Sequence, residues 1–386
     1  MIRRTTYKDN LNRLRHAVCA FGLLISLATL PAYAQQIHQL SYNGSSWTDQ
    51  NLNGAPAVQW AISAFVTTPN DQMHVFYGAV DTSDLHQLFY NGISWADLDL
   101  HQAAPGVCDY CGISGFSVAN YQYVYYIDAA NDEVHQMLYN NAQWVDTDLS
   151  YVSGASVVSY AGSNVIAFTT TPALHVFYTS DDSHVHQLYA TNGTNWQDQD
   201  LTTLTGGPLA NPSNGMSGFN IGNFQYVYYL DTSNHLHQLF YNNSKWSDED
   251  LTALTKTSPT ALYANVSAFV IPGTKKMRVY FVSAQNGHIV QLSSTNNVKW
   301  TSTDLTKKSK GSLPDEQIVA FPTTSGSQIN VYYVSGHDVN RIFQPTSTTW
   351  ANEDLTVLTN GGVADSIDEI AGFSLQNNQY VFYVAD

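Results

Sequence analysis

A His-Gln pair and a tryptophan recur together along the chain at a fixed distance. In "DLHQLFYNGISWADLDL" (residues 84–100) the pair precedes Trp95, and closely similar stretches follow at residues 133–149 and 235–251. Imidazole and amide groups make directional hydrogen bonds, and an indole ring offers a flat apolar surface. A sugar presents hydroxyl edges and apolar C–H faces, so this combination indicates repeated sites for a neutral sugar. The alternative is that the pair bonds to the backbone of a neighbouring repeat unit and the tryptophan is buried packing.

The tryptophans mark a period of about fifty residues, which is typical of repeat architectures. They are Trp47, Trp95, Trp144, Trp196, Trp246, Trp300 and Trp350. Each unit holds four short runs of alternating apolar residues, as in "ISGFSV", "YQYVYYID", "VHQMLYN" and "QWVDTDLS" from residue 113 onward. Alternation with a period of two predicts β-strands, and four strands in each unit predict the blade of a β-propeller.

The two ends of the repeat predict how the ring closes. After residue 34 the chain begins with the third and fourth strands of a unit, "IHQLSYN" and "SSWTDQNL", and it ends with the first and second, "EIAGFSL" and "QYVFYVAD". Six whole units and two complementary halves make seven. We therefore predict that residues 35–386 form an all-β, seven-bladed β-propeller of four-stranded antiparallel blades, closed by N-terminal and C-terminal half-blades. Such closure removes exposed sheet edges.

Residues 1–34 have the features of a signal peptide. A basic stretch that ends at Arg15 precedes the apolar run "AVCAFGLLISLATL" and then "PAYAQQ". This order predicts cleavage after about Ala34 and a secreted or periplasmic protein. The apolar run of 14 residues is short for a membrane span. Retention as an uncleaved anchor is the alternative, but we expect no membrane insertion of the mature chain.

The charge balance narrows the choice of partners. Asp and Glu outnumber Lys and Arg by 31 to 15, which gives a formal net charge of −16. Nucleic acids and anionic membrane surfaces repel such a chain, so we expect no nucleic-acid partner. The surface must consist largely of neutral hydrogen-bonding side chains, because charged residues are few and the chain has 25 tyrosines. Such a surface suits glycans or glycoconjugates as partners.

Cys108 and Cys111 stand in a C-x-x-C motif that allows three interpretations. A redox motif of this kind normally begins a helix, and no helical pattern surrounds this one. A zinc site would need two further ligands nearby. We predict a local disulfide that braces a loop in an oxidising compartment.

An Asp pair follows the tryptophan in the pattern W-x-D-x-D-L. The pairs are Asp97 and Asp99, Asp146 and Asp148, Asp198 and Asp200, and Asp248 and Asp250. Calcium is one interpretation, but it needs six or more oxygens, usually from a tight loop that contains glycine. Here a leucine follows directly in a strand-like run. We favour turn capping, and we expect no cofactor and no metal site.

The pattern "RVYF" (residues 278–281), followed by "QL" (291–292) and Trp300, resembles the fucose-specific lectin family first known from fungi. The resemblance implies sugar sites between blades. An Arg of the second strand and a Glu of the third would grip hydroxyl groups, and Tyr and Trp of the next blade would form the wall. The Arg position corresponds to His74, Tyr123, His175, Tyr226, Arg278, Asn330 and Tyr380. The Glu position corresponds to Gln87, Gln136, Gln187, Gln238, Gln291, Arg341 and, in the closing blade, Gln39.

The resemblance singles out particular pockets. Two are best equipped: His74 and Gln87 with Tyr139 and Trp144, and His175 and Gln187 with Tyr241 and Trp246. Two further pockets combine Arg278 and Gln291 with Trp350, and Gln39 and Tyr380 with Tyr90 and Trp95. The pocket of Asn330 and Arg341 is expected to be degenerate, and His86 is expected to be structural. Only Arg278 keeps the family's Arg and no position keeps its Glu, and single-chain members have six blades rather than seven.

Three functions compete. The preferred one is a secreted, multivalent lectin with inter-blade sites for neutral sugars, with fucose or fucosylated glycans as candidates. The second is a non-catalytic propeller scaffold for protein–protein interaction. The third is a propeller glycosidase or lyase, but a glycosidase needs an asymmetric pair of carboxylates and none stands out from the repeats. We therefore predict that the protein is not an enzyme.

Overall fold

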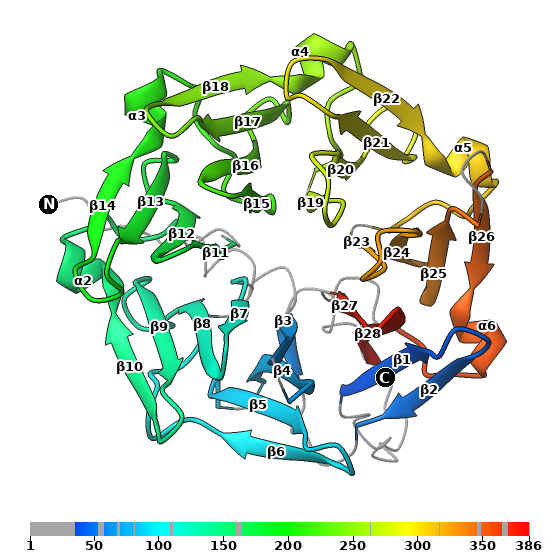
Figure 1. Ribbon diagram of the computed structural model, residues 1–386, viewed down its shortest axis with the longest axis horizontal. Coiled ribbons are helices and arrows are strands. Elements are labelled where there is room, and N and C mark those ends of the chain that lie inside the picture. The colour runs from blue at the N-terminus through cyan, green and yellow to red at the C-terminus, as the bar shows by residue number, and fades with distance from the viewer. Residues whose placement is uncertain are drawn as a thin grey trace, which may run out of the picture. The chain divides into compact units, whose positions relative to one another are not determined.

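Seven four-stranded antiparallel sheets are arranged as a ring (Figure 1). The structure is a computed structural model, and it describes residues 35–52, 58–67, 70–80, 82–108, 111–159, 164–262, 264–315, 317–345, 349–364 and 370–385. The predicted signal peptide lies outside the described residues. The all-β, seven-bladed β-propeller predicted from the repeat is confirmed.

In blades 1 to 6 the four strands follow each other in chain order from the inside of the ring to the outside (Figure 1). Blade 1 holds β3 (Val58–Thr67), β4 (Gln72–Ala79), β5 (Leu85–Tyr90) and β6 (Trp95–Asp99). Blade 2 holds β7 (Ser114–Val118), β8 (Tyr121–Ile127), β9 (Val134–Tyr139) and β10 (Trp144–Asp148). Blade 3 holds β11 (Ile166–Thr170), β12 (Ala173–Thr179), β13 (Val185–Ala190) and β14 (Gln197–Asp200). Blade 4 holds β15 (Ser217–Ile221), β16 (Phe224–Leu230), β17 (Leu236–Tyr241) and β18 (Trp246–Asp250).

The remaining three blades follow the same plan. Blade 5 holds β19 (Ser267–Val270), β20 (Met277–Val282), β21 (Ile289–Ser294) and β22 (Trp300–Asp304). Blade 6 holds β23 (Ile318–Pro322), β24 (Ile329–Ser335), β25 (Asp338–Phe343) and β26 (Ala351–Asp354). Blade 7 joins the two ends of the chain: β27 (Ala371–Leu375), β28 (Asn378–Ala385), β1 (Gln36–Tyr42) and β2 (Trp47–Asn51).

The ring closes through the pairing of β1 with β28. The two strands are antiparallel, and Gln39 lies opposite Phe382 in their register. The inner strands also form a continuous circle, because β27 of blade 7 contacts β3 of blade 1 as the other inner strands contact their neighbours. The predicted closure by complementary half-blades is therefore confirmed.

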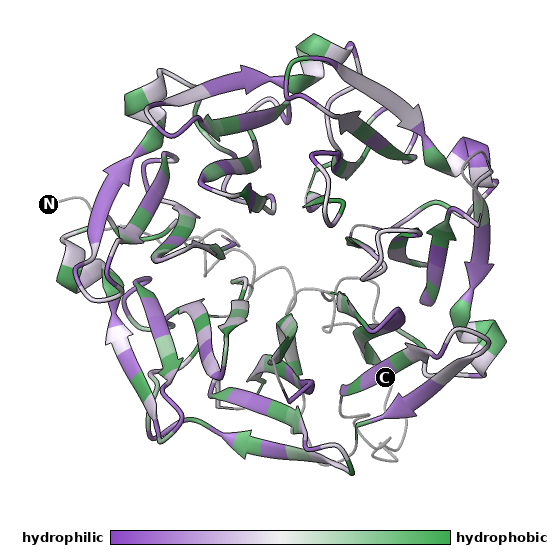
Figure 2. Cartoon of the chain, viewed as in Figure 1, coloured by the Kyte–Doolittle hydropathy of each residue, from purple (hydrophilic) through white to green (hydrophobic). Residues whose placement is uncertain are grey.

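Both faces of a blade are buried because each blade packs against two others. In β4, Val75, Phe76 and Tyr77 are all fully buried although they alternate between the two faces. The outer strands are different: β2, β14 and β26 are largely hydrophilic (Figure 2). Aromatic side chains thus fill the spaces between blades, while the rim meets the solvent.

Serine hydroxyls join the inner strands of neighbouring blades. The Oγ of Ser63 accepts a hydrogen bond from the backbone N–H of Gly115 at 3.0 Å, and Ser114 Oγ accepts one from Ala167 at 3.0 Å. Ser217 and Ser267 repeat the contact further round the ring. Gly115 is needed there because a Cβ atom would lie 2.6 Å from the Phe65 ring. These serines, rather than the His-Gln pairs, bond to the backbone of the neighbouring blade.

Short helices follow five of the outer strands. They are α2 (Leu149–Ser153), α3 (Leu201–Thr205), α4 (Leu251–Thr255), α5 (Leu305–Ser309) and α6 (Leu355–Thr359). The second Asp is the helix N-cap in three of the four W-x-D-x-D patterns: Asp148 accepts a hydrogen bond from Tyr151 N and Asp250 accepts one from Ala253 N, each at 2.8 Å, and Asp200 does the same. In the fourth pattern Asp99 caps a turn, where it accepts a hydrogen bond from His101 N at 2.8 Å. The capping interpretation is confirmed. The leucine that was expected to continue a strand instead begins a helical turn.

Cys108 and Cys111 form a disulfide, as predicted. Both cysteines lie between the last strand of blade 1, β6, and the first strand of blade 2, β7. Among the described residues, no helix is both long enough and apolar enough to cross a membrane.

Candidate functional site

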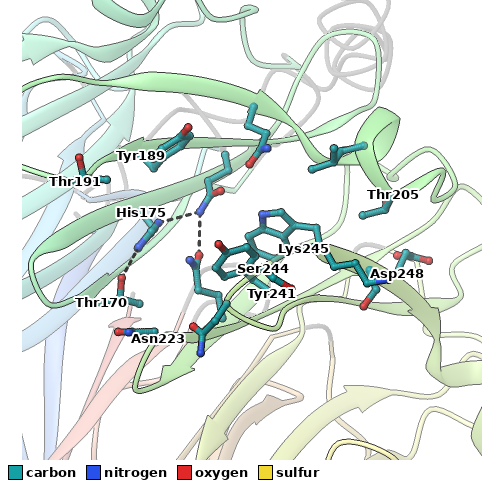
Figure 3. Close-up of a pocket in the computed structure, with 17 residues that line it drawn as sticks. Thr170, His175, Tyr189, Thr191, Thr205, Asn223, Tyr241, Ser244, Lys245 and Asp248 are labelled. Carbon is teal, nitrogen blue, oxygen red and sulfur yellow. Dashed lines mark hydrogen bonds between the residues drawn. The ribbon is translucent and has the colours of Figure 1, made fainter.

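The interface between blades 3 and 4 contains a continuous chain of polar side chains. His175 of β12 and Gln187 of β13 lie on adjacent strands, and Gln187 Nε2 is 2.9 Å from His175 Nδ1. The same Nε2 donates to Oε1 of Gln225, on β16 of the next blade, at 2.9 Å. On the other side of the imidazole, His175 Nε2 lies 2.7 Å from Thr170 Oγ1. Figure 3 shows this chain as dashed lines that run from Thr170 through His175.

The donors in this chain fix the tautomer of His175. An amide nitrogen only donates, so Nδ1 of His175 must accept the hydrogen bond from Gln187. Nε2 then carries the proton and donates a hydrogen bond to Thr170 Oγ1. Burial lowers the pKa of His175 to about 4, which keeps the ring neutral. Gln187 Oε1 and Gln225 Nε2 have no hydrogen-bond partner among the described residues, so both are available to a ligand.

A cavity of about 1090 Å³ lies against this chain. His175, Gln187, Tyr241 and Trp246 all line it, so the structure brings together the four residues that the sequence assigned to this pocket. Gln225 and Asn223 add amide groups from blade 4. Tyr189, Tyr241 and Lys245 border the same space (Figure 3). The cavity therefore combines an aromatic wall with neutral, directional hydrogen-bonding groups, while Lys245 and Asp248 add one charge of each sign to its border.

The tryptophans are mainly packing residues. Trp246 is only 8% exposed, and its ring meets Phe177 of blade 3 edge-on at a centroid distance of 6.0 Å. The same edge-on contact recurs in Trp47 with Tyr332, Trp95 with Phe382, Trp144 with Phe76, Trp196 with Tyr125, and Trp300 with Tyr228. A cavity wall can still use the exposed edge of the indole together with the Tyr241 ring, 5.3 Å away.

The interface between blades 1 and 2 repeats the polar chain. Gln87 Nε2 is 2.9 Å from His74 Nδ1 and donates to Gln122 Oε1 of blade 2 at 2.8 Å. His74 Nε2 lies 3.2 Å from Thr67 Oγ1. Burial lowers the pKa of His74 to about 4, as in the other copy. Within blade 2 Tyr139 packs on Trp144 at 5.3 Å, and Trp144 meets Phe76 of blade 1 edge-on at 5.7 Å, so the predicted aromatic residues lie at the same interface as the polar chain.

Three other interfaces use the repeated glutamine differently. Their second strands carry a tyrosine two residues after the Arg position, where blades 1 and 3 carry Phe76 and Phe177. The tyrosine hydroxyl holds the glutamine of its own blade at about 3 Å in each case: Tyr125 with Gln136, Tyr228 with Gln238, and Tyr280 with Gln291. In these blades the glutamine makes no bond of this kind to the following blade among the described residues. The inter-blade chain thus forms, among the described residues, where a phenylalanine at this position is combined with a histidine at the Arg position and a glutamine on the next blade.

The pocket predicted around Arg278 is brought together only in part. Its guanidinium donates from Nη1 to the backbone carbonyl of Met277 at 2.8 Å, and Gln291 is held by Tyr280. Burial lowers the pKa of Arg278. Trp350 packs against the apolar cluster that contains Tyr280. Arg278 and Gln291 therefore share an interface without bonding to each other.

The pocket of the closing blade assembles its aromatic residues but lacks a polar chain. Trp95 contacts Tyr90 at 5.5 Å, and it packs in one apolar cluster with Tyr380. Gln39 is buried, and among the described residues its Nε2 has only the sulfur of Met73 at 3.8 Å as a partner. A thioether is a weak acceptor. This interface therefore has the predicted aromatic wall, but the residues described there do not form the hydrogen-bonded polar pair that was predicted to hold sugar hydroxyls.

The Arg341 pocket is filled by its own side chain, as expected for a degenerate site. The guanidinium bonds to the Asn330 side chain at 2.7 and 3.0 Å and to Glu353 at 3.1 Å. It lies 4.0 Å from the centre of the Phe343 ring and 5.4 Å from that of Trp47, across the interface. Arg341 thus occupies the interface between blades 6 and 7.

The histidine of the third strand bonds within its own blade, so the alternative interpretation, a bond to the backbone of the neighbouring repeat unit, is wrong for this residue. His86 Nδ1 lies 3.0 Å from Asp97 of β6, and the same carboxylate accepts from the Tyr77 hydroxyl at 2.6 Å. Blades 2, 3, 4 and 7 repeat the His–Asp contact. Burial opposes the charged form of His86, but the hydrogen bond and charge of Asp97 outweigh it and raise the pKa. His86 is structural, as predicted, and the first Asp of each pair is its partner.

Gln122 and Gln225 are site residues that the sequence analysis missed. They lie directly before the Arg position in "QYVYY", and the corresponding residue in blades 3 and 5 is Leu174 or Met277. A polar residue where other repeats have an apolar one, on a strand buried on both faces, was the signal that could have revealed them.

The sequence signature of the fungal fucose-specific lectins matches residues 164–365, which is more than half of the chain. The chain belongs to this family. No curated protein sequence matches it significantly. The family is one of lectins rather than enzymes, in agreement with the prediction that the protein is not an enzyme.

The fold of this family member is similar to that of solved lectins. The SapL1 lectin, in complex with α-methyl fucoside, is 16% identical with a TM-score of 0.54, and the match covers 78% of this chain and 96% of that one. AofleA from Arthrobotrys oligospora is 13% identical with a TM-score of 0.54, covering 90% and 92%. The six-bladed Aleuria aurantia lectin is 16% identical with a TM-score of 0.53, covering 77% and 94%. At these identities the similarity concerns the fold, and this chain differs from the Aleuria lectin in having seven blades.

Proposed function

We propose that the protein is a secreted lectin that binds neutral sugars at two inter-blade sites, one between blades 1 and 2 and one between blades 3 and 4. The observation that carries this proposal is the neutral His–Gln–Gln chain beside an aromatic wall. The imidazole holds the first glutamine, and the second glutamine comes from the next blade. Both amides are therefore fixed before a ligand arrives, which reduces the entropy cost of binding.

The chemistry of the cavity favours an uncharged ligand. His175 is neutral, and the amides of Gln187 and Gln225 offer an acceptor and a donor for sugar hydroxyls. Tyr241 and the edge of Trp246 supply the apolar surface that a C–H face of a sugar needs. We propose α-fucosides and fucosylated glycans as the first ligands to test, supported by the family and by the fucoside in the SapL1 complex. Fucose carries a methyl group and no charge, which suits this wall.

Two sites on one ring would bind multivalent surfaces more tightly than single sugars. Single sugar sites are weak, and simultaneous occupation of linked sites raises the apparent affinity. A secreted protein would meet glycan-coated surfaces outside the cell, in keeping with the predicted signal peptide.

A glycan array with the purified mature protein tests the proposal. We expect binding to neutral, and above all fucosylated, glycans. Gln225→Met and Gln122→Met give the matched variants, since blade 5 naturally has Met277 at this position. The double variant should lose binding, whereas Gln238→Ala, at the interface between blades 4 and 5, should keep it. Absence of binding to every glycan would contradict the proposal and favour the protein-interaction scaffold.

A further inference from the structure

Three potential metal ligands gather at the start of β13 in blade 3. In "DSHVH", Asp182 lies in the turn that leads into β13, His184 directly precedes the strand, and His186 is its second residue. One ligand atom from each lies within 4.8 Å of the others. Such a group of residues is common on protein surfaces, so the contacts of its buried member are decisive.

His186 has one nitrogen engaged and one unpartnered. Its side chain is 6% exposed, and Nδ1 lies 3.0 Å from both carboxylate oxygens of Asp198. Nδ1 therefore donates to Asp198, and the lone pair remains on Nε2. Nε2 is buried and has no hydrogen-bond partner. A buried, unpaired polar atom costs about 1–3 kcal/mol, so its persistence requires an explanation.

A bound cation explains this arrangement. Metal-ligating histidines usually donate their other ring N–H to a carboxylate, which fixes the tautomer and turns the lone pair toward the metal. Asp198 makes this contact with His186, and Asp200 lies 2.8 Å from Nδ1 of His184. Asp182 is held by hydrogen bonds from Ser180 and from the backbone N–H of His184, while its side chain is 56% exposed. The group is thus ordered on one side and open to solvent on the other.

Blade 4 shows what the same strand looks like without a free nitrogen. Ser233, His235 and His237 stand at the corresponding positions, so the first carboxylate is missing. Nε2 of His237 instead lies 3.6 Å from Asp231. In blade 2, the related group of Asp128, Glu133 and His135 is already satisfied, because Asp128 accepts hydrogen bonds from three backbone N–H groups. Only in blade 3, among the described residues, does such a group retain a buried, unpaired imidazole nitrogen.

We propose that Asp182, His184 and His186 bind a divalent transition-metal ion of the zinc class. Two imidazoles and one carboxylate are a common zinc donor set, and water would complete the tetrahedral coordination. The proposal revises the expectation that the chain has no metal site. The site is separate from the sugar cavity, because His186 and its neighbour Gln187 point to opposite faces of β13.

Zinc titration of the purified, chelator-treated protein by isothermal calorimetry tests the site. We expect one Zn²⁺ per chain. Asp182→Ser, which copies Ser233 of blade 4 and changes an exposed side chain, should abolish this binding and leave the melting temperature of the metal-free protein unchanged. Asp198→Asn should weaken it by about 10–100-fold, because the imidazole loses its orienting carboxylate.

His235→Gln in blade 4 is the matched control and should leave the zinc titration unaltered. The proposal is overturned if the protein takes up no zinc, if Asp182→Ser binds zinc as the parent does, or if His235→Gln abolishes binding. Calcium should not compete with zinc, since it prefers six or more oxygen ligands. Displacement of zinc by equimolar calcium would contradict the assigned donor set.

Discussion

The interface between blades 3 and 4 and the interface between blades 4 and 5 share the repeated glutamine of the third strand, yet among the described residues only the first has a polar chain across it. Blade 3 presents Phe177 beside Gln187, and blade 4 presents Tyr228 beside Gln238. The Tyr228 hydroxyl holds its glutamine at 2.9 Å, whereas Phe177 leaves Gln187 free to join His175 and the next blade. A tyrosine hydroxyl thus holds the glutamine within its own blade, and a polar chain between blades needs a phenylalanine there together with the histidine and the glutamine of the next blade.

The largest effect is expected from Arg341→Ala, which would empty the filled interface between blades 6 and 7. Arg341 is almost fully buried and bonds to Asn330 and Glu353. Its removal leaves a buried amide and a half-buried carboxylate without their partner. The free energy of unfolding should fall by about 2–4 kcal/mol in urea denaturation. An unchanged denaturation midpoint would mean that the contacts of Arg341 do not stabilise the interface between blades 6 and 7.

Phe177→Tyr should convert the prepared interface into the closed kind. The new hydroxyl would lie beside Gln187 as the Tyr228 hydroxyl lies beside Gln238, and it would compete for the amide. Sugar affinity at this site should fall by about tenfold, the value of one hydrogen bond. Calorimetry with a simple glycoside measures this change. Full affinity in the variant would show that the orientation of Gln187 does not control binding.

Tyr228→Phe is the reverse change and should have a smaller effect. Gln238 would lose its only side-chain hydrogen-bond partner among the described residues, and blade 4 has no histidine to replace it, since Tyr226 stands at that position. The expected cost is about 1 kcal/mol of unfolding free energy, with no gain of sugar binding. A new binding site in this variant would mean that the histidine is dispensable.

The smallest effect is expected for the pH dependence of sugar binding. Burial lowers the pKa of His74 and His175 to about 4, below their unfolded value of about 6.5. Between pH 6.5 and pH 4 the unfolded chain binds more protons at these two residues than the folded chain does. Their contribution to stability is therefore fully present above about pH 6.5, decreases as the pH falls, and is lost at the folded pKa. Sugar affinity should be constant from neutral pH to about pH 5 and fall near pH 4, because a protonated Nδ1 cannot accept from the glutamine. A midpoint near pH 6.5 would contradict a buried neutral imidazole.

Much of the fold was predictable because its signals are local. The tryptophan period and the two-residue alternation lie within each repeat, and the half-units at the two ends fixed the number of blades. The second aspartates were also correctly assigned to caps, since the N-cap bond of Asp148 spans only three residues.

The contacts between strands were harder to predict. The bond between His86 and Asp97 depends on the register of β5 with β6, which the alternation alone does not set. The bond between Gln87 and Gln122 joins residues on different blades, 35 positions apart. Family resemblance located Gln87, but only the structure showed that an amide of the next blade completes the chain. Pairs of this kind depend on how blades pack, and no pattern within a single repeat contains that information.

Calorimetric stoichiometry with methyl α-L-fucoside tests the central claim most directly. Two sites per chain are expected, at the interfaces of blades 1 with 2 and 3 with 4. Gln225→Met should reduce the number to one, and the double variant with Gln122→Met should bind none, with the melting temperature nearly unchanged. Binding at every blade interface, or an unchanged stoichiometry in the double variant, would contradict the assignment of the sites to the His–Gln–Gln chains.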